Sequence, residues 1–431
     1  MTQPPRTHET QLAVIGTGLA GFAAAIRARS RGLDTVQIGN TGALAYTTGY
    51  FDLLGAETGR LIDDPWAGLA ELRRQGSDHP LARISDADIG AAFHEVLGVL
   101  SEAGLAYTDP GQRNLMALLP GGTRKPTLCV PRTMLDGIEA VSDGRRGLIV
   151  DFIGLQGFSA REFTVNATGF WPGLRGETAA FPDMDSGAQV YVEVMARAME
   201  VPETRGRLAT EIKAMLGDAE CVGLPAILGV HGSLGIQRDM QQLIGVPVFE
   251  IPTMPPAVPG IRLRETLENS LPGEGMKLVS QHKATRLEGR PDGLSIFFQD
   301  NFGEVEIRAE AAILATGRFL SGGLDANRDE IRETLVGIPV QQPEARGEWF
   351  RPDYLDNAGH PINRAGIIVD EAMRPLGPDG KPVNERMFAA GIILAGHDWV
   401  RQRCGAGVAF ASALKAVEAA SQLCVSPWHV R

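Results

Sequence analysis

The chain has 431 residues, 44% of them hydrophobic and 22% charged, which is the composition of a folded globular protein with about two to three domains. Its net charge is −11 and no block is rich in Lys or Arg, so we expect no nucleic-acid partner. No apolar run approaches the ~20 residues that span a bilayer, and the polar N-terminus lacks the apolar segment of a secretory signal. We therefore expect a cytoplasmic protein that would reach a membrane through a partner.

The start of the chain predicts a βαβ unit. Residues 11–16 form a short apolar run typical of a strand, and residues 19–30 are rich in Ala and lack Pro, as in a helix. Residues 35–38 have the pattern of a second strand. Two strands joined by one helix imply a parallel sheet, and a further helix is expected over residues 85–103.

The rest of the chain predicts a second α/β domain inserted into the first. The predicted strands and helices of this insertion lie at residues 147–154, 187–199, 203–216, 221–229 and 246–252. The chain then returns to the first domain with segments at residues 304–316, 387–391 and 407–423. The predicted fold class is α/β, a Rossmann-type domain with a parallel sheet (1–144 and 257–431) and an inserted α/β domain (145–256).

The strongest motif is the G-x-G-x-x-G at the end of the first strand. Gly16 allows a tight turn, Gly18 lets the backbone approach a phosphate, and Gly21 lets the helix pack against the sheet. The N-terminus of the helix offers free N–H groups to an anion, so we expect Leu19 and Ala20 to bind the cofactor with these glycines. The alternative is a glycine turn in an α/β fold that binds no nucleotide.

The acid that usually accompanies this motif is missing. A dinucleotide site normally has Asp or Glu at the end of the second strand, where it binds the adenosine ribose. Here Asn40 occupies that end, and Asp34 precedes the strand, at the wrong end of the sheet. Asn40 could still bond a ribose hydroxyl. The absence favours a cofactor without the adenosine half.

Two further segments are candidates for contact with a flavin. Thr47, Thr48 and Gly49 follow the second strand, and small hydroxyl residues there could bond the edge of a flavin ring. The alternative for these three residues is a capped loop. Thr316 and Gly317 end the predicted strand 304–316, where the sheet of a flavoprotein returns beneath its nucleotide.

A glycine-rich helix start near the end of the chain is the last candidate cofactor segment. Gly405, Ala406, Gly407 and Val408 open the last helix shortly after Gly391. A helix dipole aimed at the pyrimidine edge of a reduced flavin would stabilise its negative charge. The alternative is ordinary packing of helix and strand at small residues.

Candidate catalytic residues flank these glycine segments. A ring at His397 could reach a substrate, although a lone His is more often a structural or surface residue. Arg318, Arg401 and Arg403 could pair with a phosphate or carboxylate, although for any one of them a solvated surface side chain is the more common role. No metal site is expected, because Cys129, Cys221, Cys404 and Cys424 lack the close spacing of zinc and iron–sulfur ligands.

Strings along the chain resemble the B subunit of anaerobic glycerol-3-phosphate dehydrogenase. The resemblance covers nearly the whole chain, and it is densest over residues 251–414. It rests, in order, on GTGLAG, TTGYFDLLG, IPTMPPAVPGIRLRETLE, LATGRFLSGGLDANRDEIRETLVGIPV, ARGEWF and CGAGVAFASALKA. A wider resemblance connects the chain to fumarate reductase-like flavoproteins, which share the G-x-G-x-x-G start and the late glycine-rich helix.

The resemblance implies a flavoprotein that acts in a complex. In this family the A and B subunits form the catalytic pair that oxidises glycerol 3-phosphate to dihydroxyacetone phosphate, and an iron–sulfur C subunit holds them at the inner face of the membrane. Electrons pass to menaquinone and then to fumarate or nitrate. The family implies FMN as the cofactor, with FAD as the alternative. Two other functions stay open, a flavin electron relay without a substrate site and a stand-alone reductase of the fumarate type.

Overall fold

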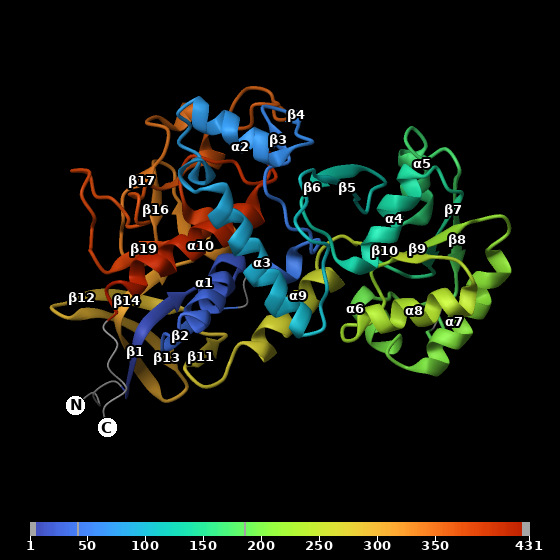
Figure 1. Ribbon diagram of the computed structural model, residues 1–431, viewed down its shortest axis with the longest axis horizontal. Helices are drawn as coiled ribbons and strands as arrows, with labels where there is room; N and C mark the ends of the chain where they lie inside the picture. The colour runs from blue at the N-terminus through green and yellow to red at the C-terminus, as the bar shows by residue number, and fades with distance from the viewer. Residues whose placement is uncertain (1–5, 41–42, 185–186, 425–431) are drawn as a thin grey trace. The chain divides into compact units, whose positions relative to one another are not determined.

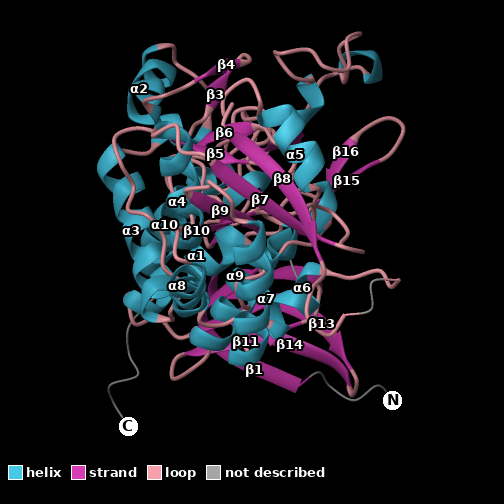
Figure 2. Cartoon of the chain, turned by 90° about the vertical axis from the view of Figure 1, so that its right-hand side faces the viewer, coloured by secondary structure: helices cyan, strands magenta, loops and turns pink. Residues whose placement is uncertain are grey.

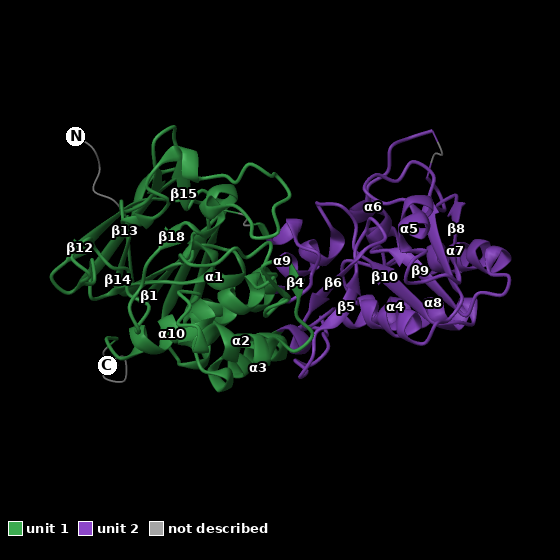
Figure 3. Cartoon of the chain, turned by 90° about the horizontal axis from the view of Figure 1, so that it is seen from above, with its two compact units in different colours: residues 1–43, 52–99, 267–431 green, residues 44–51, 100–266 purple. Residues whose placement is uncertain are grey.

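A computed structural model describes residues 6–40, 43–184 and 187–424. The chain forms two compact units, which Figure 3 shows in different colours. Unit 1 comprises residues 1–43, 52–99 and 267–431, and unit 2 comprises residues 44–51 and 100–266. Two of the four unit boundaries fall inside α-helices, α3 (Asp86–Glu102) and α9 (Val258–Ser270).

Unit 1 is built on a seven-stranded sheet in the order β11-β2-β1-β14-β13-β12, with β19 pairing with β14 (Figure 1). Its strands are β1 (Arg6–Ile15), β2 (Thr35–Gly39), β11 (Met276–Ser280), β12 (Ala284–Arg290), β13 (Gly293–Asp300), β14 (Gly303–Leu314) and β19 (Met387–Ala389). The pairs among β11, β2, β1, β14 and β19 are parallel, whereas β12 and β13 extend the sheet in antiparallel pairing. The carboxyl ends of the parallel strands therefore share one edge.

The core of unit 1 follows from the predicted βαβ unit. The last six residues of β1 are buried, and α1 (Leu19–Ser30) has the bounds that the sequence predicted. Five buried alanines of α1 provide a surface without long side chains, and α1 contacts β1, β2 and α10 (Gly405–Ser421). The predicted α/β class with a parallel sheet is confirmed.

Smaller elements complete unit 1. They are α2 (Pro65–Arg74) and three short pairs, β3 (Ala56–Glu57) with β4 (Arg60–Leu61), β15 (Leu324–Ala326) with β16 (Ile331–Glu333), and β17 (Val340–Gln341) with β18 (Gly366–Ile367). Within the part of the chain that the structure describes, no helix is long and apolar enough to cross a bilayer.

Unit 2 contains a four-stranded parallel sheet in the order β10-β9-β7-β8, with helices beside it (Figure 2). Its elements are β5 (Leu115–Leu118), β6 (Arg124–Thr127), α4 (Arg132–Ser142), β7 (Gly147–Phe152), α5 (Ala160–Ala167), β8 (Leu174–Ala179), α6 (Val192–Ala198), α7 (Pro202–Met215), β9 (Cys221–Pro225), α8 (Ser233–Ile244) and β10 (Val248–Ile251). The strands of this sheet are buried except on β8, as expected for a parallel sheet covered by helices.

Unit 2 takes in more of the chain than the insertion predicted at residues 145–256. Helix α4 precedes that range, yet its Met134 and Ile138 share a hydrophobic cluster with Leu148 and Val150 of β7. Hydrophobic burial therefore joins α4 to this sheet. The helix predicted at 187–199 is shorter in the structure, because the Val190 amide donates to the Gly154 carbonyl at 2.9 Å and extends the chain there.

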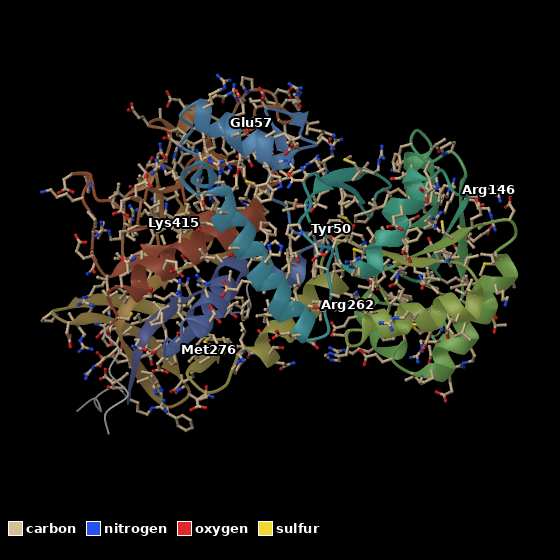
Figure 4. The ribbon with its side chains drawn as sticks, in the orientation of Figure 1. Tyr50, Glu57, Arg146, Arg262, Met276 and Lys415 are labelled. Carbon is tan, nitrogen blue, oxygen red and sulfur yellow. The ribbon has the colours of Figure 1, made fainter. Side chains whose placement is uncertain are left out.

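A buried ion pair links β10 to α9 in unit 2. The guanidinium of Arg262, labelled in Figure 4, donates to both carboxylate oxygens of Glu250 at 2.6 and 2.7 Å. Glu250 also accepts from the Thr133 hydroxyl at 2.6 Å and the Leu228 amide at 2.7 Å, and Arg262 donates to the Gly229 carbonyl at 2.7 Å. Every guanidinium nitrogen and both carboxylate oxygens thus have a hydrogen-bond partner, which lowers the cost of burying the ion pair.

Candidate functional site

The three motif glycines differ in the space around them. Two have no room for a side chain, and one faces open space. A Cβ on Gly16, whose φ is +135°, would lie 2.1 Å from the Ala315 carbonyl oxygen, and a Cβ on Gly21 would lie 2.0 Å from the Gly16 oxygen. Both positions therefore exclude a side chain because backbone approaches them. A Cβ on Gly18 meets nothing within 4 Å. Gly18 thus leaves open space at the start of α1, where a phosphate would approach.

The N-terminus of α1 suits an anion at this position. Gly18 is the N-cap, no side chain caps the helix, and the first turn carries no acid. The first N–H groups of a helix point outward along its axis and carry partial positive charge. Leu19 and Ala20 belong to this first turn. The residues present therefore fit a phosphate-bearing cofactor.

The end of β2 is held against the glycine loop by neutral groups. The Thr17 hydroxyl donates to the Asn40 carbonyl, and the Gln37 amide donates to the Gly16 carbonyl at 2.9 Å. Gly39 has no room for a side chain, since its Cβ would lie 2.7 Å from the Thr17 nitrogen. Asn40 is exposed at this end, and no carboxylate occupies residues 37–40. The next two residues, 41–42, lie outside the described residues.

Two other predicted cofactor segments meet the glycine loop at the same edge of the sheet. Thr316 and Gly317 follow β14, where the Ala315 amide donates to the Ile15 carbonyl at 2.8 Å. Gly391 follows β19, and a Cβ there would lie 2.5 Å from the Cβ of Ala20. The buried Thr316 hydroxyl has no hydrogen-bond partner among the described residues. An unpartnered hydroxyl at this edge is consistent with a ligand site.

Helix α10 is linked to Gly391 through Ser412, the eighth of its 17 residues. The Gly391 amide donates to the Ser412 hydroxyl at 2.8 Å. No side chain caps α10 at Cys404, although the Gly407 amide donates to the Asp52 carbonyl at 2.7 Å. The predicted residues Gly405, Ala406, Gly407 and Val408 therefore belong to a helix start that packs against the Asp52 segment. The Asp52 carbonyl accepts from the Gly407 amide and from neither the Gly405 nor the Ala406 amide. Those two amides are therefore the candidates for binding a ligand at the start of α10.

Thr47, Thr48 and Gly49 belong to unit 2. Both the amide and the hydroxyl of Thr47 donate to the Leu44 carbonyl, at 3.1 and 3.0 Å, which is the geometry of a capped turn. Gly49 has φ of +79°, and its Cβ would lie 2.7 Å from the Cβ of Pro259. These contacts explain the residues as parts of a turn, and their role toward a flavin stays a prediction.

Arg318 is buried and bound to backbone. Its relative exposure is 5%, so it is not a solvated surface arginine. Its guanidinium donates to the carbonyls of Ile392 and Asn363, to that of Leu394 at 2.8 Å, and to that of His397 at 3.1 Å. Burial lowers the pKa of Arg318 to about 10, which leaves it charged at neutral pH. Its donors are therefore committed to the protein itself.

His397 is fully buried and faces a second buried histidine that no sequence motif indicated. The rings of His397 and His79 lie edge to face with centroids 5.6 Å apart. Burial lowers the pKa of His79 to about 3 and that of His397 well below its usual value, with Arg318 adding to the second effect. The Nε2 atoms of both rings lack partners among the described residues. Both rings are neutral at pH 7, and neither offers an exposed face to a substrate.

Arg401 and Arg403 differ in what they leave free. The Arg401 amide donates to Asp398 at 3.2 Å, and its guanidinium reaches the Tyr354 carbonyl at 3.4 Å. Arg403 has φ of +51°, an uncommon conformation outside glycine, and it directly precedes the Cys404 cap of α10. The Nη1 atom of Arg403 is buried with no partner among the described residues. Arg403 is thus the candidate arginine with a donor to spare.

A buried polar network supports the segment before α10. The Asp398 amide donates to Gln402 at 2.8 Å, and Gln402 donates in turn to Glu57, labelled in Figure 4, at 2.6 Å. The Asn363 amide group donates to Asp398 at 3.1 Å. These residues come from three separate stretches of sequence with no shared spacing. No sequence pattern could therefore indicate that they meet.

Comparison with known proteins agrees with this geometry. The chain matches the model of the FAD binding domain family over residues 11–408, which is most of its length. It belongs to that family of flavin-dependent oxidoreductases.

Individual relatives match the chain almost end to end. The chain is 28% identical to the B subunit of a probable anaerobic glycerol-3-phosphate dehydrogenase from Halobacterium salinarum, over 96% of this chain and 98% of that protein. The B subunit of the anaerobic glycerol-3-phosphate dehydrogenase of Pectobacterium atrosepticum is 29% identical, over 94% of this chain and 97% of that protein. A solved structure of a flavocytochrome c3 fumarate reductase is also similar, with 10% identity and a TM-score of 0.43 over 98% of this chain and 80% of that chain.

Proposed function

We propose that unit 1 binds a flavin with its phosphate at the Gly16–Gly21 loop. The observation that carries the proposal is the open space beside Gly18 at the uncapped start of α1. Gly391, Thr316 and the start of α10 would contact the ring, because they lie at the same edge of the sheet. A bound flavin would accept a hydride from an alcohol carbon of the substrate.

We propose that this flavin is FMN, with FAD as the alternative. The carboxylate that would accept bonds from two ribose hydroxyls is replaced by Asn40, and each such bond is worth about 1.5–3 kcal/mol. A single terminal phosphate suits the helix N-terminus. The family description names FAD, and a pyrophosphate would also fit a glycine loop. Chromatography of the released flavin decides, and AMP after phosphodiesterase treatment would overturn FMN.

We further propose that the chain is the B subunit of a dehydrogenase that oxidises glycerol 3-phosphate to dihydroxyacetone phosphate. Support comes from the names of relatives that match almost end to end, and from the resemblance in the sequence. A catalytic A subunit and an iron–sulfur C subunit would complete the complex at the inner face of the membrane and pass electrons to menaquinone. We expect the chain to co-purify from membranes with two further subunits. Recovery of the whole chain outside the membrane fraction would contradict attachment to the membrane.

Arg403 is our candidate for binding the substrate phosphate. Its Nη1 donor has no partner among the described residues, and a guanidinium binds phosphate by two parallel hydrogen bonds. Arg403→Lys keeps the charge but loses the paired geometry, so we expect KM for glycerol 3-phosphate to rise at least about tenfold. Arg401→Lys is the control, because the Arg401 guanidinium already donates to the Tyr354 carbonyl through Nη2. Equal KM values in the two variants would remove Arg403 from the site.

The main alternative is an electron relay without a substrate site. It is favoured by Arg318, four of whose five N–H donors bind backbone carbonyls, and by the full burial of His397. Glycerol 3-phosphate oxidation by the isolated chain with an artificial acceptor distinguishes the two. Full activity excludes the relay, whereas activity that appears only when the A subunit is present supports it. Fumarate reduction with a viologen donor would instead indicate a reductase of the fumarate type.

A further inference from the structure

The segment between β19 and α10 is bound by the buried guanidinium of Arg318. Three of the carbonyls that Arg318 binds, those of Ile392, Leu394 and His397, belong to this segment. The fourth, that of Asn363, belongs to the turn before β18. No carboxylate lies within ion-pair distance of Arg318 in the part of the chain that the structure describes. The charge is thus met directly by backbone carbonyls, and the more distant Asp398 carboxylate also favours the charged form, which raises the pKa of Arg318 against the lowering by burial.

This arrangement fixes the path of the backbone. A guanidinium is planar and presents five donors in a rigid fork, so it can bind several carbonyls only where they converge on one plane. The bound segment begins at Gly391, which touches α1, and it leads to Cys404 at the start of α10. Arg318 itself follows Thr316 and Gly317. One side chain therefore ties together three of the proposed flavin-binding segments.

We propose that Arg318 is a positioning residue for the flavin, one that does not touch substrate. By holding residues 392–397 it sets the distance between Gly391 and the N-terminus of α10, so that both meet the cofactor. The inference rests on the proposed flavin site in unit 1. It replaces the prediction that Arg318 contacts a substrate anion, because four of its five N–H donors already bind backbone carbonyls.

The chain offers a matched control for this role. Arg205, in unit 2, is also mostly buried and also donates to two backbone carbonyls, those of Met199 at 2.9 Å and Glu200 at 3.1 Å. Substitution of either arginine removes bonds to backbone carbonyls and is expected to lower stability. A change in the flavin is expected from Arg318 alone, since Arg205 lies in the unit without the glycine loop.

The test is a fluorescence titration of flavin-free protein with FMN and with FAD, together with the visible spectrum and midpoint potential of the bound flavin. We compare Arg318→Lys, Arg318→Gln and Arg318→Met with Arg205→Lys and Arg205→Met. The Arg318 variants should bind flavin at least about tenfold more weakly, with a shifted spectrum and potential. Lys should be the mildest, because it keeps the charge and part of the bonding. The Arg205 variants should match the wild type.

Wild-type affinity, spectrum and potential in the Arg318 variants would overturn the positioning role. If the Met variant does not fold, the Lys and Gln variants still decide by the same readouts. A wild-type chain that binds neither flavin would instead contradict the proposed function. The two failures are therefore distinguishable in one experiment.

Discussion

At the scale of single residues, Gly18 and Gly21 are expected to respond oppositely to the same methyl group. Gly18→Ala places a Cβ in open space with an ordinary backbone conformation, so stability should hold while flavin affinity falls at least about tenfold. Gly21→Ala forces a Cβ against the Gly16 carbonyl and should lose about 1–3 kcal/mol of unfolding free energy. Urea unfolding of both variants measures the stability, and flavin titration measures the affinity. A stable Gly21→Ala, or a Gly18→Ala that binds flavin normally, would contradict the geometry.

The buried histidine pair predicts acid sensitivity. His79 has a pKa near 3 when folded against 6.5 when unfolded, so its contribution to stability is present above pH 6.5 and is lost as pH falls toward 3. The loss is about 1.4 kcal/mol per pH unit for one such group. His79→Asn keeps an acceptor for the Leu81 amide and should flatten this dependence. His94→Asn, at an exposed site, is the control. Identical slopes for His79→Asn and wild type between pH 6.5 and 5 would refute the burial argument.

Whether the sequence could predict the role of these residues depended on how far apart in sequence the interacting residues lie. The role of Gly21 depends on Gly16, a few positions away, so a motif suffices to predict it, whereas Gly16 also meets Ala315 from a distant part of the sequence. The partners of Arg318 are carbonyls 45 to 79 residues away, and any residue type supplies a carbonyl. Nothing in the sequence therefore indicates that this arginine is buried. The pairing of His79 with His397 is hidden for the same reason.

At the scale of elements, removal of one charge from the ion pair between β10 and α9 should strongly lower the unfolding free energy. Arg262→Met leaves Glu250 buried without its partner and should lower the unfolding free energy by about 3–5 kcal/mol. The double variant Glu250→Leu/Arg262→Met removes both charges and should recover part of that loss, although Thr133 and Leu228 then lose an acceptor. Urea unfolding measures both. A double variant less stable than Arg262→Met would contradict this account of the pair.

Elements with a clear periodicity were predictable, and those set by packing were not. The Ala-rich run without Pro predicted α1 at its observed bounds. The apolar runs likewise predicted β7, β9, β10 and β14 within a few residues. The region before α6 reads as helical, but pairing of Val190 with the loop after β7 overrides that local preference. Local propensity thus failed where a tertiary hydrogen bond competes with it.

At the scale of the whole molecule, the sequence predicted two α/β sheets but not which segments belong to each unit. Residues 44–51 lie close in sequence to the glycine loop, which favoured a place beside the flavin. In the structure they belong to unit 2, where Phe51 pairs with Cys129 and Tyr50 donates to the Leu118 carbonyl at 2.6 Å. Membership of a unit follows from contacts between distant segments, for which a single sequence carries no pattern.

The most direct test of the central claim is the flavin content of the purified chain. After anaerobic purification and reconstitution, the absorbance ratio and chromatography of the released cofactor give its stoichiometry and identity. We predict one flavin per chain, FMN, with binding weakened in Gly18→Ala while the far-ultraviolet circular dichroism stays that of the wild type. A correctly folded chain that retains neither FMN nor FAD would contradict the claim.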